Sequence, residues 1–234
     1  MSAKVSYLYD KKEELNELVA YFDPQYINNK CCNFKQRGGR GQTLLFTNEN
    51  GRGLVLRHYF RGGLIGKFLK DSFFLCEQRA HRAFDEYQLL SWMYDQGLAV
   101  PKPVIAREIK HLLYIKQDIV IEQIDDSLDL AHIICDRYLT DAEFANIGKC
   151  IGKMFALNVD HTDLNIRNIL LDKSGKVYLI DFDKCFRCVL TAERKRAILE
   201  RLLRSFNKEL VVSTKKCYFE PKAFDILVSS ALSA

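Results

Sequence analysis

The sequence predicts an α+β fold with two lobes, an antiparallel β-sheet lobe with one key helix and then a mainly helical lobe. Strand-like apolar runs bounded by turn residues dominate the first half of the chain. Apolar residues at helical spacing dominate the second half. Asp125, Asp126 and Ser127 interrupt the chain between these halves. We therefore expect a first lobe over residues 1–124 and a second lobe over residues 125–234, which together form one working unit.

The composition is that of an ordinary globular protein. The chain has 234 residues, of which 48% are hydrophobic, and this composition excludes a largely disordered or low-complexity protein. Its net charge is modest, at +5. No apolar stretch approaches the roughly 18 residues of a membrane span, and the N-terminus lacks the apolar segment of a secretory signal. We expect the protein to remain in the cytoplasm.

The eight cysteines do not suggest a disulfide framework. Their spacing is irregular, the chain is long and no secretory signal is expected, so reduced and mostly buried thiols are the better interpretation. Cys185 and Cys188 form a CxxC pair, but it lacks the second CxxC or histidine pair of a zinc site.

The first lobe is expected to begin with a helix and a β-hairpin. Apolar spacing predicts an amphipathic helix over residues 10–22, which Pro24 would end. The glycines of residues 38–41 form a turn signal. A hairpin follows, with strands at residues 43–46 and 53–57.

The rest of the first lobe carries the key helix and further strands. Residues 79–96 have the clearest helical spacing of this half, and Gly97 supplies the C-terminal stop. An extended connector occupies residues 100–104. Three strand candidates follow, at residues 104–108, 112–117 and 119–124.

The second lobe is expected to contain a long capped helix. Thr140 and Glu143 have the spacing of a capping box, and an apolar stripe continues from there to Phe155. A loop over residues 161–168 comes next. The remaining elements are two strands at residues 169–171 and 177–180 and two helices at residues 192–206 and 221–232.

This loop and the strand pair after it bring oxygen ligands together. Asp163 and Asn168 stand five positions apart, and Asp181 ends the second strand, eighteen positions after Asp163. Carboxylate and amide oxygens suit Mg²⁺, which binds one or two carboxylates together with phosphate oxygens. Phosphoryl transfer needs such a metal and a base that orients the attacking hydroxyl. An HxDxxxxN pattern, a hairpin and a strand-ending Asp resemble the catalytic signature of the protein-kinase-like superfamily. We therefore expect a two-lobed protein-kinase-like fold that binds ATP between its lobes.

Six segments, in order, resemble a narrower family. They read GGRGQT, VLRHYFRGGLIGK, RAFDEYQLL, GLAVPKPV, HTDLNIRNILLD and VYLIDFDK. They are similar to 3-deoxy-D-manno-octulosonic acid (Kdo) kinases, a bacterial lipopolysaccharide-core kinase family. The resemblance implies an ATP-dependent kinase that uses Mg²⁺ and phosphorylates the 4-hydroxyl of Kdo in a glycolipid of the Kdo-lipid IVA type. It also implies peripheral contact with the cytoplasmic face of the bacterial inner membrane.

The resemblance assigns roles within the second lobe residue by residue. Asp163 would orient the sugar hydroxyl or accept its proton, and Asn168 and Asp181 would bind the metal. His161 would brace the loop. The kinase DFG motif reads DFD here, so Asp183 is either a further metal-shell group or a turn-former.

The nucleotide-binding residues that the resemblance implies lie in the first lobe. They are Gly38, Gly39, Gly41, Arg57, Glu86, Glu122 and Ile124. The glycines would let backbone N–H groups approach phosphate. Arg57 stands where a kinase has its phosphate-pairing Lys, with Glu86 as its partner, and Lys67 is the alternative phosphate contact. The backbone from Glu122 to Ile124 would contact adenine.

Other interpretations stay open. The acceptor could be another small molecule, such as a heptose or an aminoglycoside; a protein substrate is disfavoured because a helix is expected soon after Asp183. Arg57 in place of Lys would also fit a catalytically inactive kinase-fold scaffold. The basic residues between positions 51 and 70 could contact phosphates, an anionic membrane or nucleic acid. No nucleic-acid-binding module is recognisable, however, and no obligate protein partner is inferred.

Two groups of side chains are candidates for contact with an anionic glycolipid or its membrane. Tyr59 and Phe60, within the basic segment, could enter a membrane interface. Four basic residues near the start of the helix at 192–206 either line the acceptor site or form a solvated face: Arg187, Arg194, Lys195 and Arg196.

Overall fold

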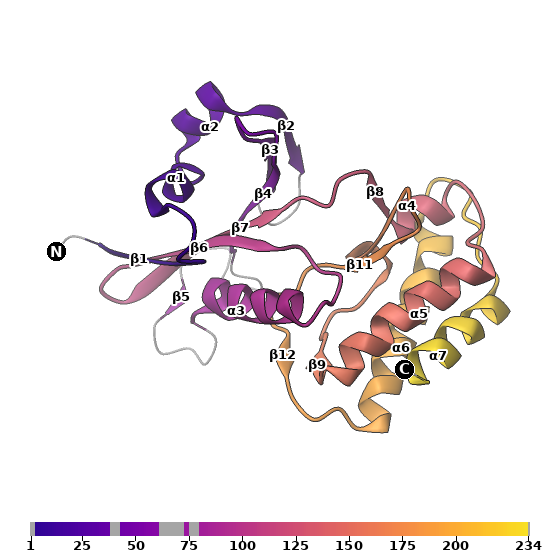
Figure 1. Cartoon of the computed structure of the whole chain (residues 1–234). Coiled ribbons are helices and arrows are strands. Elements are labelled where there is room, and N and C mark those ends of the chain that lie inside the picture. The colour runs from indigo at the N-terminus through magenta and orange to yellow at the C-terminus, as the bar shows by residue number, and fades with distance from the viewer. Residues whose placement is uncertain (1–2, 38–42, 61–72, 75–79, 234) are drawn as a thin grey trace. The chain divides into compact units, whose positions relative to one another are not determined.

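The chain forms two compact units in the computed structural model (Figure 1). The structure describes residues 3–37, 43–60, 73–74 and 80–233. The first unit consists of Met1–Ser91 and Pro101–Ile124, and the second of Trp92–Val100 and Asp125–Ala234. The sequence division at residues 124 and 125 thus assigns Trp92–Val100 to the first lobe, whereas the contacts group this segment with the second unit.

The first unit is built on an antiparallel sheet with the strand order β1-β6-β7-β4-β3-β2, and β5 pairs with β7 outside this path. The strands are β1 Lys4–Tyr9, β2 Cys32–Arg37, β3 Thr43–Thr47, β4 Gly53–His58, β5 Phe73–Phe74, β6 Pro103–Lys110 and β7 Tyr114–Glu122. The hairpin predicted over residues 43–57 is confirmed, and Gly51 has a φ of 78° in its turn. Strands β1 and β2 were not predicted from the sequence.

β7 is one continuous strand where the sequence predicts two. Asp118 stands between the expected strands, and a carboxylate buried without partners would be costly. Its oxygens lie 2.7 Å from Nη2 of Arg107 and 2.6 Å from Nδ1 of His58. Because these partners stabilise Asp118 inside the sheet, the strand runs on, and the prediction of separate strands at residues 112–117 and 119–124 is wrong.

Two short helices, α1 Leu15–Ala20 and α2 Pro24–Lys30, pack on one face of this sheet (Figure 1). The core between them comprises Leu18, Tyr21, Phe22, Ile27, Phe46, Leu54, Val104, Ile105 and Val120. The helix predicted over residues 10–22 is therefore shorter than expected, and Pro24 begins a helix. Proline is tolerated at a first helical position, and the side chain of Asp23 accepts a hydrogen bond from the N–H of Gln25 at 2.8 Å.

The helix predicted over residues 79–96 is observed as α3 Arg82–Asp95. Gln117 fixes its start, because the Gln117 amide accepts from the N–H of Ala83 at 2.9 Å and donates to the carbonyl of Ala80 at 2.7 Å. Gln117 and Val120 point to opposite faces of β7, since side chains alternate along a strand. The N-terminal part of α3 therefore lies on the sheet face opposite α1 and α2 (Figure 1).

The second unit contains most of the helices among the described residues. They are α4 Leu130–Ile134, α5 Asp141–Ala156, α6 Ala192–Val212 and α7 Phe224–Leu232, with 3₁₀ helices η2 Ile166–Asn168 and η3 Pro221–Ala223. The capping box of Thr140 and Glu143 is confirmed at the start of α5. α6 continues six residues beyond the predicted end at Phe206, because Glu209 is still buried on its inner face.

Short strands connect these helices. β8 Ser127–Asp129, β10 Ile169–Asp172 and β11 Val177–Leu179 form a sheet in the order β11-β10-β8, and β9 Val159–Asp160 pairs with β12 Phe186–Arg187. The predicted strands at residues 169–171 and 177–180 are therefore confirmed. Strands β8, β9 and β12 and helix α4 were not predicted from the sequence.

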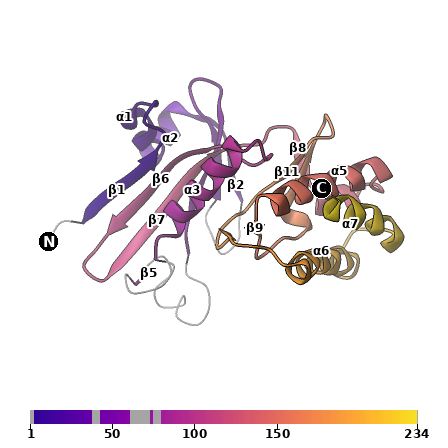
Figure 2. The same ribbon diagram turned by 60° about the horizontal axis from the view of Figure 1, so that its bottom comes forward.

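α5 and α7 pack closely against each other, as Figure 2 shows. Gly148 makes this possible, since a Cβ atom there would lie 2.4 Å from the carbonyl oxygen of Leu227 and 2.6 Å from Cβ of Ser230. Both distances are well below a van der Waals contact. Any larger residue at position 148 would push the two helices apart.

The seven described cysteines are all free. Only Cys150 among them is buried, and that burial raises the pKa of its thiol to about 12. The expectation of mostly buried thiols is therefore wrong. Across the described residues, no helix combines the length and apolar character needed to cross a membrane.

Candidate active site

The loop over residues 161–168 follows β9 and ends in η2, and its geometry is set by backbone carbonyls. Asn168 donates from Nδ2 to the carbonyl oxygen of Asp163 at 3.0 Å, and Asn165 donates to the same oxygen at 2.8 Å. Because the nitrogen of the Asn168 amide is occupied by this bond, its Oδ1 is the atom suited to a cation. The Asp163 carboxylate projects to solvent, with 64% of the side chain exposed.

The strand pair that follows brings the third predicted residue to this loop. The N–H of Ile180 donates to the carbonyl oxygen of Asn168 at 3.0 Å, and Asp181 is the next residue. Asp181 has a φ of 65°, in the left-handed region that non-glycine residues rarely adopt. Such conformations concentrate at functional sites. The structure thus gathers Asp163, Asn168 and Asp181 within the second unit, on adjoining pieces of backbone.

His161 braces this arrangement from inside. Its ring is fully buried, its Nε2 lies 3.1 Å from the carbonyl oxygen of Ile180, and it packs against Phe182 with ring centroids 4.8 Å apart. Its Nδ1 has no hydrogen-bond partner among the described residues. Burial lowers the pKa of His161, so the ring is neutral and donates from Nε2. This geometry agrees with the bracing role, and Asp163 is the more exposed of the two residues.

α6 holds the same loop, and Asp160 of β9 directly before it, through polar contacts along one side. Arg194 pairs with Asp160 through two 2.7 Å hydrogen bonds, and Arg201 lies 3.0 Å from the Asp163 carboxylate. Ser205 accepts from the N–H of Ile166 at 3.1 Å. Further along α6, Glu209 accepts two 2.8 Å hydrogen bonds from Arg167. The loop is therefore fastened to a single long helix.

The α6 residues that make most of these contacts were not predicted from the sequence. Arg201, Ser205 and Glu209 follow Arg194 at intervals of seven, four and four residues, which places all four on one helical face. That spacing of polar residues is the signal that could have revealed them. Of the predicted acceptor candidates, Arg194 is held by buried Asp160, and Arg187 stacks on Trp92 with 3.8 Å between the guanidinium carbon and the ring centroid.

The donor set suits Mg²⁺ better than a metal held by protein ligands alone. No group of three or more His, Cys, Asp or Glu side chains in the described part of the chain could hold a metal. Asn168 and Asp181 offer an amide oxygen and a carboxylate instead. Mg²⁺ characteristically combines one or two such ligands with water and phosphate oxygens. These residues therefore fit the metal of a nucleotide-dependent reaction.

In the first unit, Arg57 and Glu86 form the ion pair that the sequence predicts. Glu86 is buried on α3 and also accepts a hydrogen bond from the hydroxyl of Tyr59. Burial and the Glu86 charge raise the pKa of Tyr59 well above its usual value, so Tyr59 stays a donor. Arg82 stacks over the Tyr59 ring at 5.3 Å. Tyr59 is buried in this cluster, so its expected insertion into a membrane is wrong.

The other predicted nucleotide residues divide into two groups. Gly38, Gly39, Gly41 and Lys67 lie outside the described residues. Glu122 ends β7, and its carboxylate pairs with Arg52 at 2.7 Å. The N–H groups of Glu122 and Gln123 donate to the carbonyls of Lys102 and Gly53, respectively. Neither N–H group is therefore free to form a hydrogen bond with adenine. Ile124 is the last residue of the first unit.

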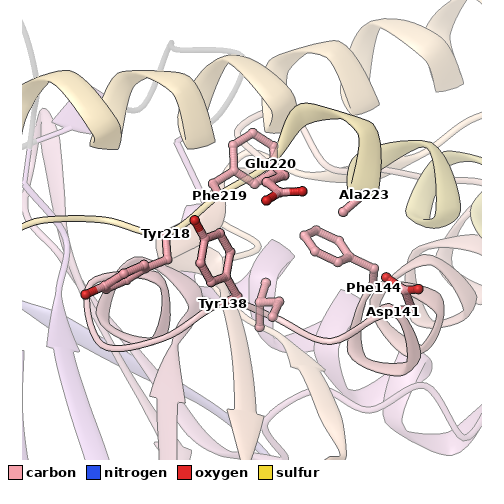
Figure 3. Close-up of a pocket in the computed structure, with 8 residues that line it drawn as sticks. Tyr138, Asp141, Phe144, Tyr218, Phe219, Glu220 and Ala223 are labelled. Carbon is pink, nitrogen blue, oxygen red and sulfur yellow. The ribbon is translucent and has the colours of Figure 1, made fainter.

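A separate cavity of about 180 Å³ lies in the second unit (Figure 3). It is lined by Tyr138, Leu139, Asp141, Phe144, Tyr218, Phe219, Glu220 and Ala223. Phe144 and Phe219 belong to the aromatic core around Phe206. None of the predicted site residues lines this cavity, so it is not part of the candidate active site.

Comparison with known proteins gives consistent matches over most of the chain. The Lipopolysaccharide kinase (Kdo/WaaP) family matches residues 28–220. A 3-deoxy-D-manno-octulosonic acid kinase of Vibrio cholerae is 40% identical over 210 residues, covering 86% of this chain and 87% of the relative. A kinase with the same name from Haemophilus influenzae (strain 86-028NP) is 41% identical over 211 residues and 87% of each chain. A third, from Vibrio vulnificus (strain YJ016), is 36% identical over 221 residues, or 94% of this chain and 92% of the relative.

Proposed function

The chain belongs to the lipopolysaccharide kinase (Kdo/WaaP) family, and on this premise we propose that it phosphorylates the 4-hydroxyl of Kdo on a lipid A precursor. The phosphoryl donor is ATP. Similarity to proteins named 3-deoxy-D-manno-octulosonic acid kinase over most of both chains supports this acceptor. The reaction belongs to the assembly of the lipopolysaccharide core.

The proposal rests on the hydrogen bonds that connect Asp163 to Asn168 and Asn168 to Ile180. Asp163 exposes its carboxylate while its backbone carbonyl is fixed by two side-chain amides. In the proposed step, the acceptor oxygen forms a bond to the γ-phosphorus and the bond from that phosphorus to the β–γ bridging oxygen breaks. ADP leaves, and the hydroxyl proton passes to Asp163. Positioning and charge stabilisation supply most of the catalysis in such reactions.

Asn168 and Asp181 are the proposed ligands of Mg²⁺. Bound there with phosphate oxygens, the metal would neutralise charge on the phosphates of ATP. The chain's own contribution is to fix the two ligands, through the Asn168 amide bond to Asp163 and the Ile180 backbone bond to Asn168. Arg57, held by Glu86, is the proposed phosphate contact of the first unit.

We also propose that the protein contacts the cytoplasmic face of the bacterial inner membrane peripherally. The turn between β6 and β7 supports this, because Leu112 and Leu113 are 76% and 66% exposed there. Lys110 and Lys116 flank the two leucines in sequence. Exposed apolar side chains beside cations suit the interface of a membrane with anionic lipids.

Mass spectrometry of Kdo-lipid IVA after incubation with the protein, ATP and Mg²⁺ tests the proposed reaction. The expected product has gained one phosphoryl group, located on Kdo by fragmentation, and Asp163→Ala gives no product. If the protein binds ATP and leaves the mass of this lipid unchanged, but transfers phosphate to a heptose or an aminoglycoside, that molecule is the acceptor instead of Kdo. ATP binding without transfer to any of these acceptors would favour the inactive scaffold.

A further inference from the structure

Arg201 is the feature of the second unit that the proposed reaction leaves unexplained. It projects from α6, and its Nη1 donates to Oδ1 of Asp163 at 3.0 Å. Both side chains are substantially exposed, at 49% for Arg201 and 64% for Asp163. An exposed ion pair of this kind contributes little to stability. The contact of Arg201 with the predicted catalytic carboxylate is therefore not explained by a contribution to stability.

Two other arginines of this region are paired with buried carboxylates. Arg167, within the loop, makes two 2.8 Å hydrogen bonds with buried Glu209. Arg194, two turns before Arg201 on α6, makes two 2.7 Å hydrogen bonds with buried Asp160. These pairs anchor α6 to the loop on both sides of Arg201. They hold the backbone of Arg201 beside the carboxylate while its side chain stays exposed.

A guanidinium so close to the base lies where the acceptor must bind. The acceptor hydroxyl has to approach the Asp163 carboxylate, so the rest of the acceptor's sugar ring comes next to Arg201. An octulosonic acid carries a carboxylate on the same ring system as its hydroxyls. The planar donor fork of arginine matches a carboxylate with two parallel hydrogen bonds.

We propose that Arg201 binds the carboxylate of the acceptor sugar acid while Asp163 receives the proton of its hydroxyl. This inference rests on the proposed function and adds a specificity residue to the same site. The exposed pair with Asp163 opens when the acceptor enters, which releases both side chains for the substrate. Neutral heptoses and cationic aminoglycosides have no carboxylate to offer, so Arg201 selects against them.

Steady-state kinetics with two acceptors test this assignment. Wild type, Arg201→Ala, Arg201→Lys and Arg204→Ala are compared on Kdo-lipid IVA and on the same lipid with the Kdo carboxylate reduced to an alcohol. Arg204 is the matched control, because it lies three residues further on the same helix in an exposed pair with Glu200 at 3.9 Å. Denaturation midpoints of all variants establish that they are folded.

The expected result is an increase in the KM for the acceptor that depends on both Arg201 and the acceptor carboxylate. Arg201→Ala raises the KM for Kdo-lipid IVA about 10- to 100-fold, the value of a charged hydrogen-bonded pair. Reducing the carboxylate has the same effect on wild type and no further effect on Arg201→Ala. Arg201→Lys raises the KM for Kdo-lipid IVA less than Arg201→Ala does, and Arg204→Ala has the KM of wild type. The KM for ATP is the same in all variants.

Two results would overturn the assignment. If Arg201→Ala raises the KM for ATP and leaves that for the acceptor unchanged, Arg201 serves the nucleotide phosphates. If Arg201→Ala behaves like Arg204→Ala on both acceptors, it has no role in recognition. Calorimetric binding of free Kdo and of carboxyl-reduced Kdo to wild type and Arg201→Ala separates this test from the reaction. Wild type that binds Kdo through Arg201 but transfers no phosphate would contradict the proposed function alone.

Discussion

The side-chain amide of Asn168 is hydrogen-bonded to the backbone carbonyl of Asp163 across 3.0 Å. This hydrogen bond fixes the distance between the predicted base, Asp163, and a predicted metal ligand, Asn168. Asn168→Asp keeps an oxygen ligand but replaces the donor with a second acceptor that faces the carbonyl. We expect phosphoryl transfer to fall about 100-fold and the free energy of unfolding to fall by about 1–3 kcal/mol. Steady-state assays and urea denaturation measure the two effects.

Asn165→Asp is the matched control for that change. Asn165 donates to the same carbonyl at 2.8 Å, but it is only partly buried and is not a predicted metal ligand. A smaller loss of activity is expected, without a change in the Mg²⁺ concentration that gives half-maximal rate. Equal effects of the two substitutions on Mg²⁺ dependence would contradict the ligand role of Asn168.

Removal of the Asp163 carboxylate should separate catalysis from folding. Asp163→Ala is expected to lower transfer about 100- to 10,000-fold, the contribution of a positioned base. Within the described part of the chain, its carboxylate pairs only with exposed Arg201, so the free energy of unfolding should change by no more than about 1 kcal/mol. Product formation and a denaturation midpoint on one preparation check both. A folded variant with near-wild-type transfer would disprove the role of Asp163.

The buried Glu86 cluster of the first unit gives a prediction about the nucleotide. Glu86 receives hydrogen bonds from Arg57 and Tyr59, so Glu86→Gln weakens the hold on Arg57. The KM for ATP should rise about 10-fold, equivalent to a loss of about 1.4 kcal/mol. Tyr59→Phe removes one donor and keeps the Arg57 pair, so its KM for ATP should stay close to that of wild type. An ATP titration that fails to distinguish the variants would argue against Arg57 as a phosphate contact.

The pair of Arg194 with Asp160 should matter for stability more than any exposed pair on α6. Asp160 is buried, and Arg194→Ala leaves its carboxylate without these two hydrogen bonds. We expect a loss of about 2 kcal/mol, below the range for fully buried pairs because Arg194 is partly exposed. Arg204→Ala should stay within about 0.5 kcal/mol of wild type. Urea denaturation of the two variants provides the comparison.

Glu143 should make the free energy of unfolding depend on pH in the acidic range. The hydrogen bonds from Arg137, together with those at the start of α5, lower the pKa of Glu143 from 4.5 to about 2. A lowered pKa in the folded state stabilises above the unfolded value, and that contribution is lost as the pH falls from about 4.5 towards 2. The stability difference between wild type and Glu143→Gln should therefore be largest near neutral pH and shrink over this range. Urea denaturation at several pH values measures it, and a constant difference would contradict the shift.

Local signals in the sequence predicted the elements whose causes are local. The capping box of Thr140 and Glu143, the hairpin around Gly51 and the helix that ends before Gly97 all depend on neighbouring residues. The spacing of Asp163, Asn168 and Asp181 is of the same kind, because one hairpin joins them. These features could be predicted from a single chain.

Features that depend on distant partners could not be predicted in this way. Asp118 interrupts an apolar run in sequence, and only its pairing with Arg107 and His58 makes a continuous β7 possible. β9 and β12 are too short to carry a pattern of their own. Arg201 is 38 residues from Asp163 along the chain, so only the folded structure brings its charge to the site.

The pairing of β1 with β6 has a consequence for biosynthesis. β1 leaves the ribosome before its partner strand, which is made about 100 residues later. Until then, its backbone hydrogen-bonding groups lack their native partners and are open to pairing with other chains. We expect the nascent chain to spend this interval exposed to aggregation, and chaperone supply during translation to affect the yield of active enzyme more than the stability of the finished fold does.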